Sequence, residues 1–393
     1  MRLARRLSSV GLVLTSIDFF DELASGLPSA GAPELRVGLD TGVTLLTFVV
    51  FTAPQLFAMV VDPPLVAWAE RRGRAPMVAL GLLGMGLSLV LSGLARTPLE
   101  FGLAFALYHP ASTLACSLAQ ASLMDHDPER REHGMTAWVF AGTLGDLVAP
   151  LAISAAVLGL GTFRGAWVVV GAALVLLAPL VARCRLPRLE APPDDEASGG
   201  TFRSALRNRA LLFWLGGVGL CGLLDETFVA FGALWLEERF GSTLAVTAGL
   251  TACTLGELLG LLVLKRLLER FSPRRLLAFS CAGSVVLVVG WLGSESVLAS
   301  SVWLFAGGVL IAWQYPLAQA QAYRVAGGSG RVAVLAPLLS GFELAAPLAL
   351  GLIADRGGLT LALVAVLVQP VGLLAVLRAS RRARAAGEPT GSR

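Results

Sequence analysis

The sequence has little charge and almost no lysine. Charged residues make up 15% of its 393 residues while hydrophobic residues make up 55%, and Lys265 is the one lysine among 31 basic residues. The mean hydropathy is +0.74. This composition excludes an ordinary soluble chain and is typical of a protein that crosses the membrane many times. The net charge of +4 then reflects the membrane loops and gives no indication of nucleic-acid binding.

Patterned cysteines and catalytic motifs are also missing. The five cysteines stand singly in or beside apolar segments, without CxxC spacing, which excludes a disulfide framework and a zinc site of the usual kind. No HExxH, GxSxG or Walker A pattern occurs. We therefore expect no enzyme activity, no cofactor and no resident metal site.

Apolar segments of about 20 residues, each enough to cross the roughly 30 Å hydrocarbon layer as a helix, recur along the whole chain. They lack the polar and apolar alternation of membrane β-barrel strands. The prediction is an all-α membrane protein with twelve transmembrane helices, in two pseudo-symmetric bundles of six. The predicted segments are 7–27, 41–64, 75–95, 98–123, 135–158, 164–183, 209–236, 244–267, 274–293, 297–322, 332–354 and 359–378.

The basic residues test this topology because Arg and Lys accumulate in cytoplasmic loops. With the N-terminus inside, all but five of the 31 basic residues are cytoplasmic, and none lies at a helix centre. The five exceptions are Arg36, Arg96, Arg164, Arg239 and Arg356. The pattern predicts a multi-pass protein of the cytoplasmic (inner) membrane with both termini cytoplasmic. A signal peptide at the N-terminus is the alternative, against which three acids in its would-be apolar core argue.

The two halves of the chain share landmarks. A Pro-, Gly- and acid-containing linker, 185–208, separates a bundle predicted at 1–184 from one at 209–380, and a basic tail follows at 381–393. In the first helix of each half "DFFDELASG" corresponds to "GLLDETFVA", which aligns Asp21 and Glu22 with Asp225 and Glu226.

The repeat continues through the later helices. "LYHPAS" (107–112) corresponds to "WQYPLA" (313–318), and "GDLVAPLA" (145–152) to "FELAAPLA" (342–349). These alignments pair Pro110 with Pro316 and Asp146 with Glu343. Two parallel six-helix halves with matched landmarks are an architecture of secondary transporters.

With these features the chain resembles the major facilitator superfamily over essentially its whole length. The family's loop between helices 2 and 3 reads roughly G-x-L-a-D-r-x-G-r-k, and "VAWAERRGRA" (66–75) keeps Arg71, Gly73 and Arg74 while Val66 replaces the Gly and Glu70 the Asp. The resemblance implies that Glu70, Arg71 and Arg74 latch one conformation by pairing with neighbouring helix ends. Ordinary positive-inside charges are the alternative reading of this loop.

Two other signals of the family are absent. Its fourth helix usually carries an Arg linked to proton coupling, and 98–123 contains none. The fifth helix of many drug/proton antiporters carries a G-P-x-x-G-G run, whereas "AGTLGDLVAPLAIS" (141–154) has the Pro without the paired Gly. Both absences argue against a standard drug/proton antiporter.

Acids inside the apolar segments are the candidate functional groups, because a charge at the bilayer centre costs at least about 2.5–3.5 kcal/mol. The Lys and Arg residues of these segments lie near segment ends, so none at a helix centre neutralises them. The acids expected near the bilayer centre are Asp18, Asp21, Glu22, Asp146, Asp225, Glu226, Glu257 and Glu343. Asp18, Asp21 and Glu22 share one helical face with Ser25. Since like charges cannot all stay ionised there, we expect at least one carboxyl to hold a proton near neutral pH.

In the family, helices 1, 7, 4 and 10 line the central cavity. The resemblance therefore implies that Asp21 and Glu22 face Asp225 and Glu226 across it. Four further residues are expected between the two acidic pairs, namely Tyr108, His109, Gln314 and Tyr315.

Each of these assignments has a structural alternative. Asp18 and Asp21 could be hydrated near the outer end of their helix. Asp146 and Glu343 could tie helices together, Glu257 could be structural, and His109 could be a hydrogen-bonded packing residue.

The sequence thus favours a secondary active transporter, proton-coupled and an exporter, for a small organic solute. A cationic or neutral amphipathic substrate fits an interior without Arg or Lys better than an anion does, and Tyr108, Tyr315 and Trp138 offer aromatic faces for cation–π contact. The expected partners are this substrate, the proton and the lipid bilayer, and we expect a monomer. A proton-linked uptake permease, a divalent-metal carrier and a non-transporting sensor of the same fold remain alternatives.

Overall fold

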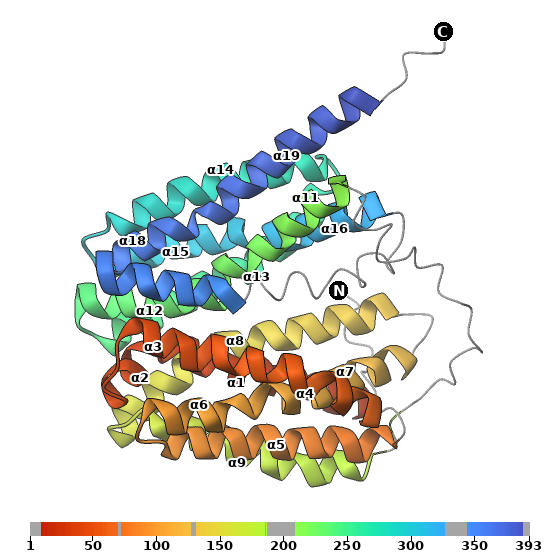
Figure 1. The fold of residues 1–393 in the computed structure, drawn as a ribbon, viewed down its shortest axis with the longest axis vertical. Coiled ribbons are helices and arrows are strands. Elements are labelled where there is room, and N and C mark those ends of the chain that lie inside the picture. Colours follow the sequence, from red (N-terminus) through yellow and green to blue (C-terminus); the bar gives the residue numbers. More distant parts are fainter. Residues whose placement is uncertain are drawn as a thin grey trace. The chain divides into compact units, whose positions relative to one another are not determined.

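The computed structural model describes residues 9–69, 72–126, 131–184, 186, 209–326 and 344–387, and every structural statement below concerns these residues. Cα packing divides the chain into two compact units (Figure 1). The N-terminal unit is Met1–Ala191 with Ser242–Thr247, and the C-terminal unit is Pro192–Gly241 with Ala248–Arg393. The predicted division at 184 and 209 stays a prediction.

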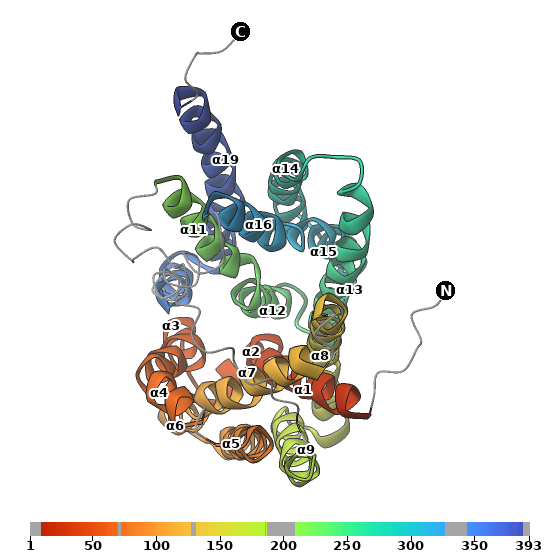
Figure 2. The same ribbon diagram turned by 90° about the vertical axis from the view of Figure 1, so that its right-hand side faces the viewer.

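The described part of the N-terminal unit is helical. Its elements are α1 (Ser9–Ala30), α2 (Ala32–Gly38), α3 (Val43–Thr47), the π-helical turn η1 (Phe48–Thr52), α4 (Ala53–Ala69), α5 (Arg74–Leu94), α6 (Pro98–Ala106), α7 (Tyr108–His126), α8 (Arg131–Leu160) and α9 (Arg164–Ala182). Helix α1 packs along α8, and α5 packs against both α9 and α7 (Figure 2).

The C-terminal unit repeats this helical character. Its elements are α11 (Arg209–Leu220), the 3₁₀ turn η3 (Cys221–Leu224), α12 (Glu226–Phe240), α13 (Thr243–Leu267), α14 (Pro273–Leu292), α15 (Val297–Ile311), α16 (Gln314–Ala326), a helix at 344–357, α18 (Leu359–Val366) and α19 (Val368–Gly387). The first residues of α13, up to Thr247, belong to the N-terminal unit.

Ten stretches of the described residues are long and apolar enough to cross a membrane, and each coincides with one of the twelve predicted segments. Helix α1 is long enough but carries three acids. The predicted segment 332–354 lies partly outside the described residues.

Four predicted continuous segments are broken in the structure. The segment 98–123 breaks at Leu107, 297–322 at Ala312 and Trp313, 359–378 at Leu367, and 209–236 at 221–225. Prolines explain three of these breaks. Pro110, Pro316 and Pro370 have no N–H for the carbonyl four residues earlier, which lies at or next to each break.

Small residues let helices of the N-terminal unit approach closely. A Cβ on Gly86 of α5 would lie 2.6 Å from the carbonyl oxygen of Gly171 on α9, and a Cβ on Gly171 would lie 2.7 Å from that of Gly86. Such contacts are typical of membrane helices, which associate by close packing of backbones rather than by hydrophobic burial.

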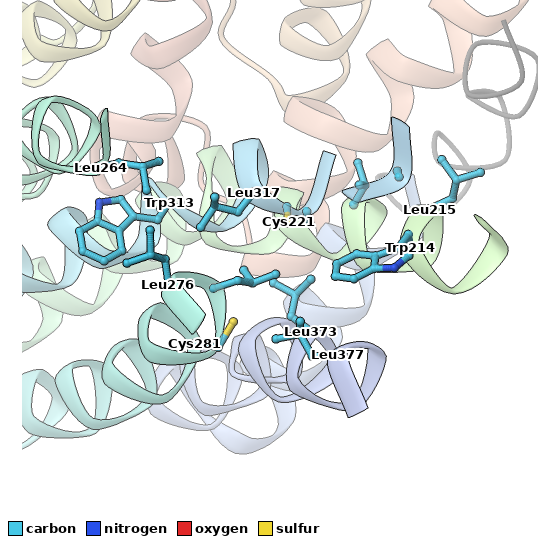
Figure 3. Close-up of a cluster of buried hydrophobic side chains, with 14 of the residues drawn as sticks. Trp214, Leu215, Cys221, Leu264, Leu276, Cys281, Trp313, Leu317, Leu373 and Leu377 are labelled. Atoms are coloured by element: carbon cyan, nitrogen blue, oxygen red, sulfur yellow. The ribbon is translucent and has the colours of Figure 1, made fainter. Parts of the chain in front are cut away.

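A hydrophobic cluster forms the core of the C-terminal unit (Figure 3). Side chains from α11, α13, α14, α16 and α19 meet in it, and Trp214 is fully buried. The Trp313 indole donates a 2.8 Å hydrogen bond to the carbonyl of Gly260, so α16 is tied to α13 at the edge of this core. The cluster fixes the positions of α16 and α19 beside the predicted seventh helix, which is broken into α11, η3 and α12.

Candidate functional site

The three acids of α1 lie where this helix meets α8. Asp18 is 5% exposed, while Asp21 and Glu22 are half-buried. An added Cβ on Gly142 of α8 would lie 2.6 Å from Oδ2 of Asp18 and 2.9 Å from Cγ of Glu22. The predicted acidic face of α1 therefore packs on a part of α8 that only glycine leaves open.

Tyr108 at the start of α7 holds the central acid. Its phenol donates to the Oδ1 atom of Asp21 at 2.7 Å and lies 2.7 Å from the carbonyl oxygen of Asp21. The Tyr108 side chain is 1% exposed, and its ring stacks on Phe105 with centroids 5.2 Å apart. Cys116, two turns further along α7, also interacts with Asp21. Tyr108 therefore joins the fourth helix to the first through a fixed hydrogen-bond donor.

Two other predicted residues lie close to this group. His109 is half-buried, its ring lies edge-on to Phe105 and Tyr108 at 6.0 and 5.8 Å, and it interacts electrostatically with Asp21. Oδ1 of Asp146 on α8 lies 3.7 Å from the position of a Cβ on Gly26 of α1. The N-terminal unit thus brings all of its predicted acids to the contacts of α1 with α7 and α8.

The matched acids of the C-terminal unit lie in a different backbone setting. Asp225 is exposed and stands at the break of the seventh helix, with φ −126° and ψ −137°, between η3 and α12. Glu226 is the first residue of α12 and is half-buried. No proline accounts for this break, although Gly222 lies inside η3.

Buried amides bridge the break. The Leu224 N–H donates to Oε1 of Gln369 at 2.8 Å, Nε2 of Gln369 donates to Oε1 of Gln314 at 2.9 Å, and Nε2 of Gln314 donates to Ser284 Oγ at 2.9 Å. Gln314 is 0% exposed and Gln369 1%. We call Leu224, Gln369, Gln314 and Ser284 the amide chain. It joins the seventh helix to α19, α16 and α14, and it occupies both polar atoms of the Gln314 side chain.

The repeat aligns Tyr108 with Gln314 and His109 with Tyr315 in the sequence. Tyr108 bonds directly to the first helix, whereas Gln314 reaches the seventh helix through Gln369. Tyr315 is 55% exposed. The aligned residues Tyr108 and Gln314 thus each connect the fourth helix of their half to the first helix of that half.

Several predicted residues are not positioned by the structure. Glu343, Glu70 and Arg71 lie outside the described residues. Gly73 precedes α5 in an extended conformation, and Arg74 is the first residue of that helix. The latch therefore stays a prediction.

Sequence reasoning missed Gln369, Ser284 and Asp62. Gln369 is the one amide within the apolar segment 359–378, which could have signalled a buried polar contact. Asp62 lies near the end of the segment 41–64 and is hydrogen-bonded to Thr113 of α7. Within the described residues no three His, Cys, Asp or Glu side chains gather as they would around a metal ion.

One cavity of about 680 Å³ opens in the N-terminal unit away from the acids. Arg96 and Arg164 line it together with Gly38, Gly93 and Gly165. The Arg164 guanidinium donates to the carbonyls of Gly93 and Ala95 at the end of α5. This cavity is lined by helix ends and basic residues, so it is not the site of the carboxyl chemistry.

Helical bundles with broken membrane helices and buried carboxyls define a polytopic carrier of the secondary-transporter class. The sequence profile of the Major Facilitator Superfamily matches residues 14–336. The chain belongs to this family of transporters, and it is not an enzyme.

Solved structures show the same fold. A bacterial homologue of the human lysosomal transporter Spinster, in an inward-facing, unoccupied conformation, superposes with a TM-score of 0.74 at 17% identity, covering 98% of each chain. The nucleoside transporter NupG superposes with a TM-score of 0.72 at 15% identity, covering 95% of this chain and 99% of the other. No curated protein sequence matches the chain significantly. The predicted family and the all-α membrane fold are confirmed.

Proposed function

We propose that this transporter couples the movement of a small cationic or neutral amphipathic organic solute to protons, by alternating access and in the direction of export. The observation that carries the proposal is the acidic face of α1. Asp18 is buried against Gly142 and Asp21 is bonded by Tyr108. Among the described residues, no Lys or Arg side chain pairs with Asp18 or Asp21.

A proton is the ligand that this arrangement suits. Carboxyls in a low-dielectric helix contact cannot all remain charged, so some must exchange protons with water as their exposure changes. A carrier that alternates its access provides such a change in every cycle. Asp18, Asp21 and Glu22 are the proposed coupling groups, and Asp146, Glu343, Asp225 and Glu226 are proposed to assist them or to meet the substrate.

Substrate charge follows from the same inventory. Carboxylate and phosphate ligands require Arg or Lys donors, and the basic residues of the apolar segments lie near segment ends, with none at a helix centre. Aromatic side chains such as Tyr315, which is 55% exposed, suit cations and flat neutral solutes. His109 is proposed to line the path of the solute beside Tyr108, and Gln314 to act through the amide chain.

The remaining proposals concern orientation and assembly. The arginine distribution supports a protein of the cytoplasmic (inner) membrane with both termini in the cytoplasm. A monomer is part of the proposal. Glu70, Arg71, Gly73 and Arg74 are proposed as the loop that latches one conformation.

The test starts by identifying a solute. Purified protein is screened by thermal shift against quaternary ammonium compounds, nucleosides and dicarboxylates, and we expect hits only in the first two groups. Hits made only of dicarboxylates would contradict the charge argument.

The coupling is tested with a hit compound in proteoliposomes. A pH gradient should drive its accumulation in wild type, and Asp21→Asn combined with Asp225→Asn should abolish that accumulation. Asp40→Asn, in the loop after α2, is the matched control and should transport as wild type does. Unchanged pH-driven transport in the double variant would exclude proton coupling through these acids.

A further inference from the structure

Asp62 is an acid of the membrane region that the proposed coupling group does not include. It lies in α4, seven residues before the helix ends at Ala69, which corresponds to about 10 Å along the axis. The residue as a whole is half-buried. It is therefore close enough to one end of the unit to exchange protons with water, yet within the apolar stretch Val43–Asp62.

One oxygen of this carboxyl has a partner and the other has none. Thr113 of α7 donates to Oδ2 of Asp62 at 2.9 Å. Oδ1 is buried and has no hydrogen-bond partner among the described residues. A buried, unpaired carboxylate oxygen is costly, and a proton on Oδ1 would remove the charge.

The backbone beside Asp62 supplies acceptors rather than donors. Pro63 and Pro64 follow it directly and have no N–H groups. The carbonyls of Met59 and Val60 therefore lack the donors that a regular helix would give them. A protonated carboxyl can donate to a carbonyl of this kind, whereas a carboxylate cannot.

Among the described side chains, the helices that pack on α4 bring no charge that compensates Asp62. Helix α4 packs on α7, α6 and η1. The described titratable side chains on these elements are Glu100, which caps α6, and Tyr108, His109 and Cys116, which interact with Asp21. Asp125 and His126 end α7 about 18 Å beyond Thr113.

Helix α7 connects this pair to the acids of α1. Thr113 follows His109 by four residues, so the two share a face of the helix. His109 in turn interacts with Asp21. The successive contacts therefore run from Asp21 of α1 through His109 and Thr113 of α7 to Asp62 of α4.

We propose that Asp62 and Thr113 form a second proton-binding site of the N-terminal unit, separate from the acids of α1. Sodium is a poorer ligand for it, because two side chains offer few oxygens and the Thr113 hydroxyl already donates to Oδ2. The use of this site during transport rests on the proposed coupling, while its occupancy by a proton does not.

Infrared spectroscopy of the purified full-length protein tests the site without a substrate. Protonated carboxyls give a C=O stretching band that disappears on titration to high pH. We expect wild type to show one such band that is missing in Asp62→Asn and retained in Asp21→Asn and Asp40→Asn. Thr113→Val should keep this band at a shifted frequency, because Oδ2 loses its donor, and this variant serves if Asp62→Asn does not fold.

Two results would overturn the proposal. The first is an Asp62→Asn spectrum that matches wild type throughout the titration. The second is a thermal stabilisation by sodium chloride over potassium chloride that Asp62→Asn abolishes, since it would identify a sodium site. Loss of coupling in the α1 variants leaves both readouts unchanged, so failure of the proposed function is distinguishable from failure of this site.

Discussion

The two acidic pairs that the repeat aligns, Asp21 with Glu22 and Asp225 with Glu226, lie in opposite kinds of backbone. Helix α1 runs unbroken through the first pair, from Ser9 to Ala30. The second pair stands where the seventh helix stops, turns through η3 and restarts as α12. Equal positions in the repeat have thus diverged into a packed helix face and a helix break.

The stabilising hydrogen bonds differ accordingly. In the first half the Tyr108 phenol bonds the Asp21 carboxyl itself. In the second half Gln369 accepts from the backbone N–H of Leu224, which lies in the 3₁₀ turn at the break. Tyr108 therefore binds the side chain of the acid in the first half, whereas Gln369 binds the backbone beside the acid in the second half.

The largest effect is expected from Gln369→Leu in the amide chain. It removes the side-chain acceptor of the Leu224 N–H and the Gln369 donor to Oε1 of the buried Gln314, at about 1–3 kcal/mol for each buried polar atom left without a partner. We expect a clearly lower midpoint of thermal unfolding in detergent micelles.

Gln319→Leu is the matched control for this change, because its Oε1 is buried and already lacks a partner among the described residues. It should be neutral or stabilising. Equal losses from both substitutions would show that the amide chain does not hold the break.

Gly145→Ala tests the unbroken helix of the first half. The added Cβ would collide with the backbone carbonyl of Phe19 and lie 2.7 Å from the backbone nitrogen of Leu23, and neither can move without separating α1 from α8. Overpacking of this kind costs about 1–3 kcal/mol. Gly159→Ala on the same helix has open space and should unfold at the wild-type temperature. A Gly145→Ala protein as stable as that control would contradict the close contact.

Tyr108→Phe removes the hydroxyl but keeps the ring that stacks on Phe105. The loss of one hydrogen bond should cost about 1 kcal/mol and weaken pH-driven transport in proteoliposomes, since Asp21 loses its donor. Tyr315→Phe, on an exposed residue, is the control for stability. Normal coupling in Tyr108→Phe would separate the hydrogen bond from proton transfer.

The smallest effect on stability is expected from Asp225→Asn. The residue is exposed at the break, where substitutions usually change stability by no more than about 0.5 kcal/mol. Asp21→Asn, which alters a half-buried acid bonded by Tyr108, should shift thermal unfolding more. Equal shifts would mean that the two pairs are energetically alike despite their different backbones.

Much of the fold was predictable because the requirements of membrane insertion are visible in the order of residues along the chain. Apolar length marks the spans, so the membrane helices and the family could be inferred from residue order alone, while the orientation read from the arginines stays a prediction. The aligned Pro110 and Pro316 stand just after the two equivalent breaks, but the prediction treated both segments as continuous and missed these breaks.

The missed features depend on contacts between helices. Hydropathy does not tell which residue of another helix faces a given polar group, so the pairing of Asp62 with Thr113 and of Gln369 with Leu224 could not be predicted. Gln314 was expected beside the substrate path, and the structure shows its amide engaged on both sides. Gly142 and Gly145 carried no signal because a glycine in a helix is informative only once its neighbour is known.

The glycine contact between α1 and α8 has a mechanical consequence. Gly145 of α8 touches the backbone of Phe19 and Leu23 on either side of Asp21, which leaves no clearance for one helix to slide along the other. The two helices must then tilt together as one rigid body. In the proposed coupling, a proton that binds to Asp18 or Asp21 would therefore move α1 and α8 together, because the tight contact between them leaves no room for a local rearrangement.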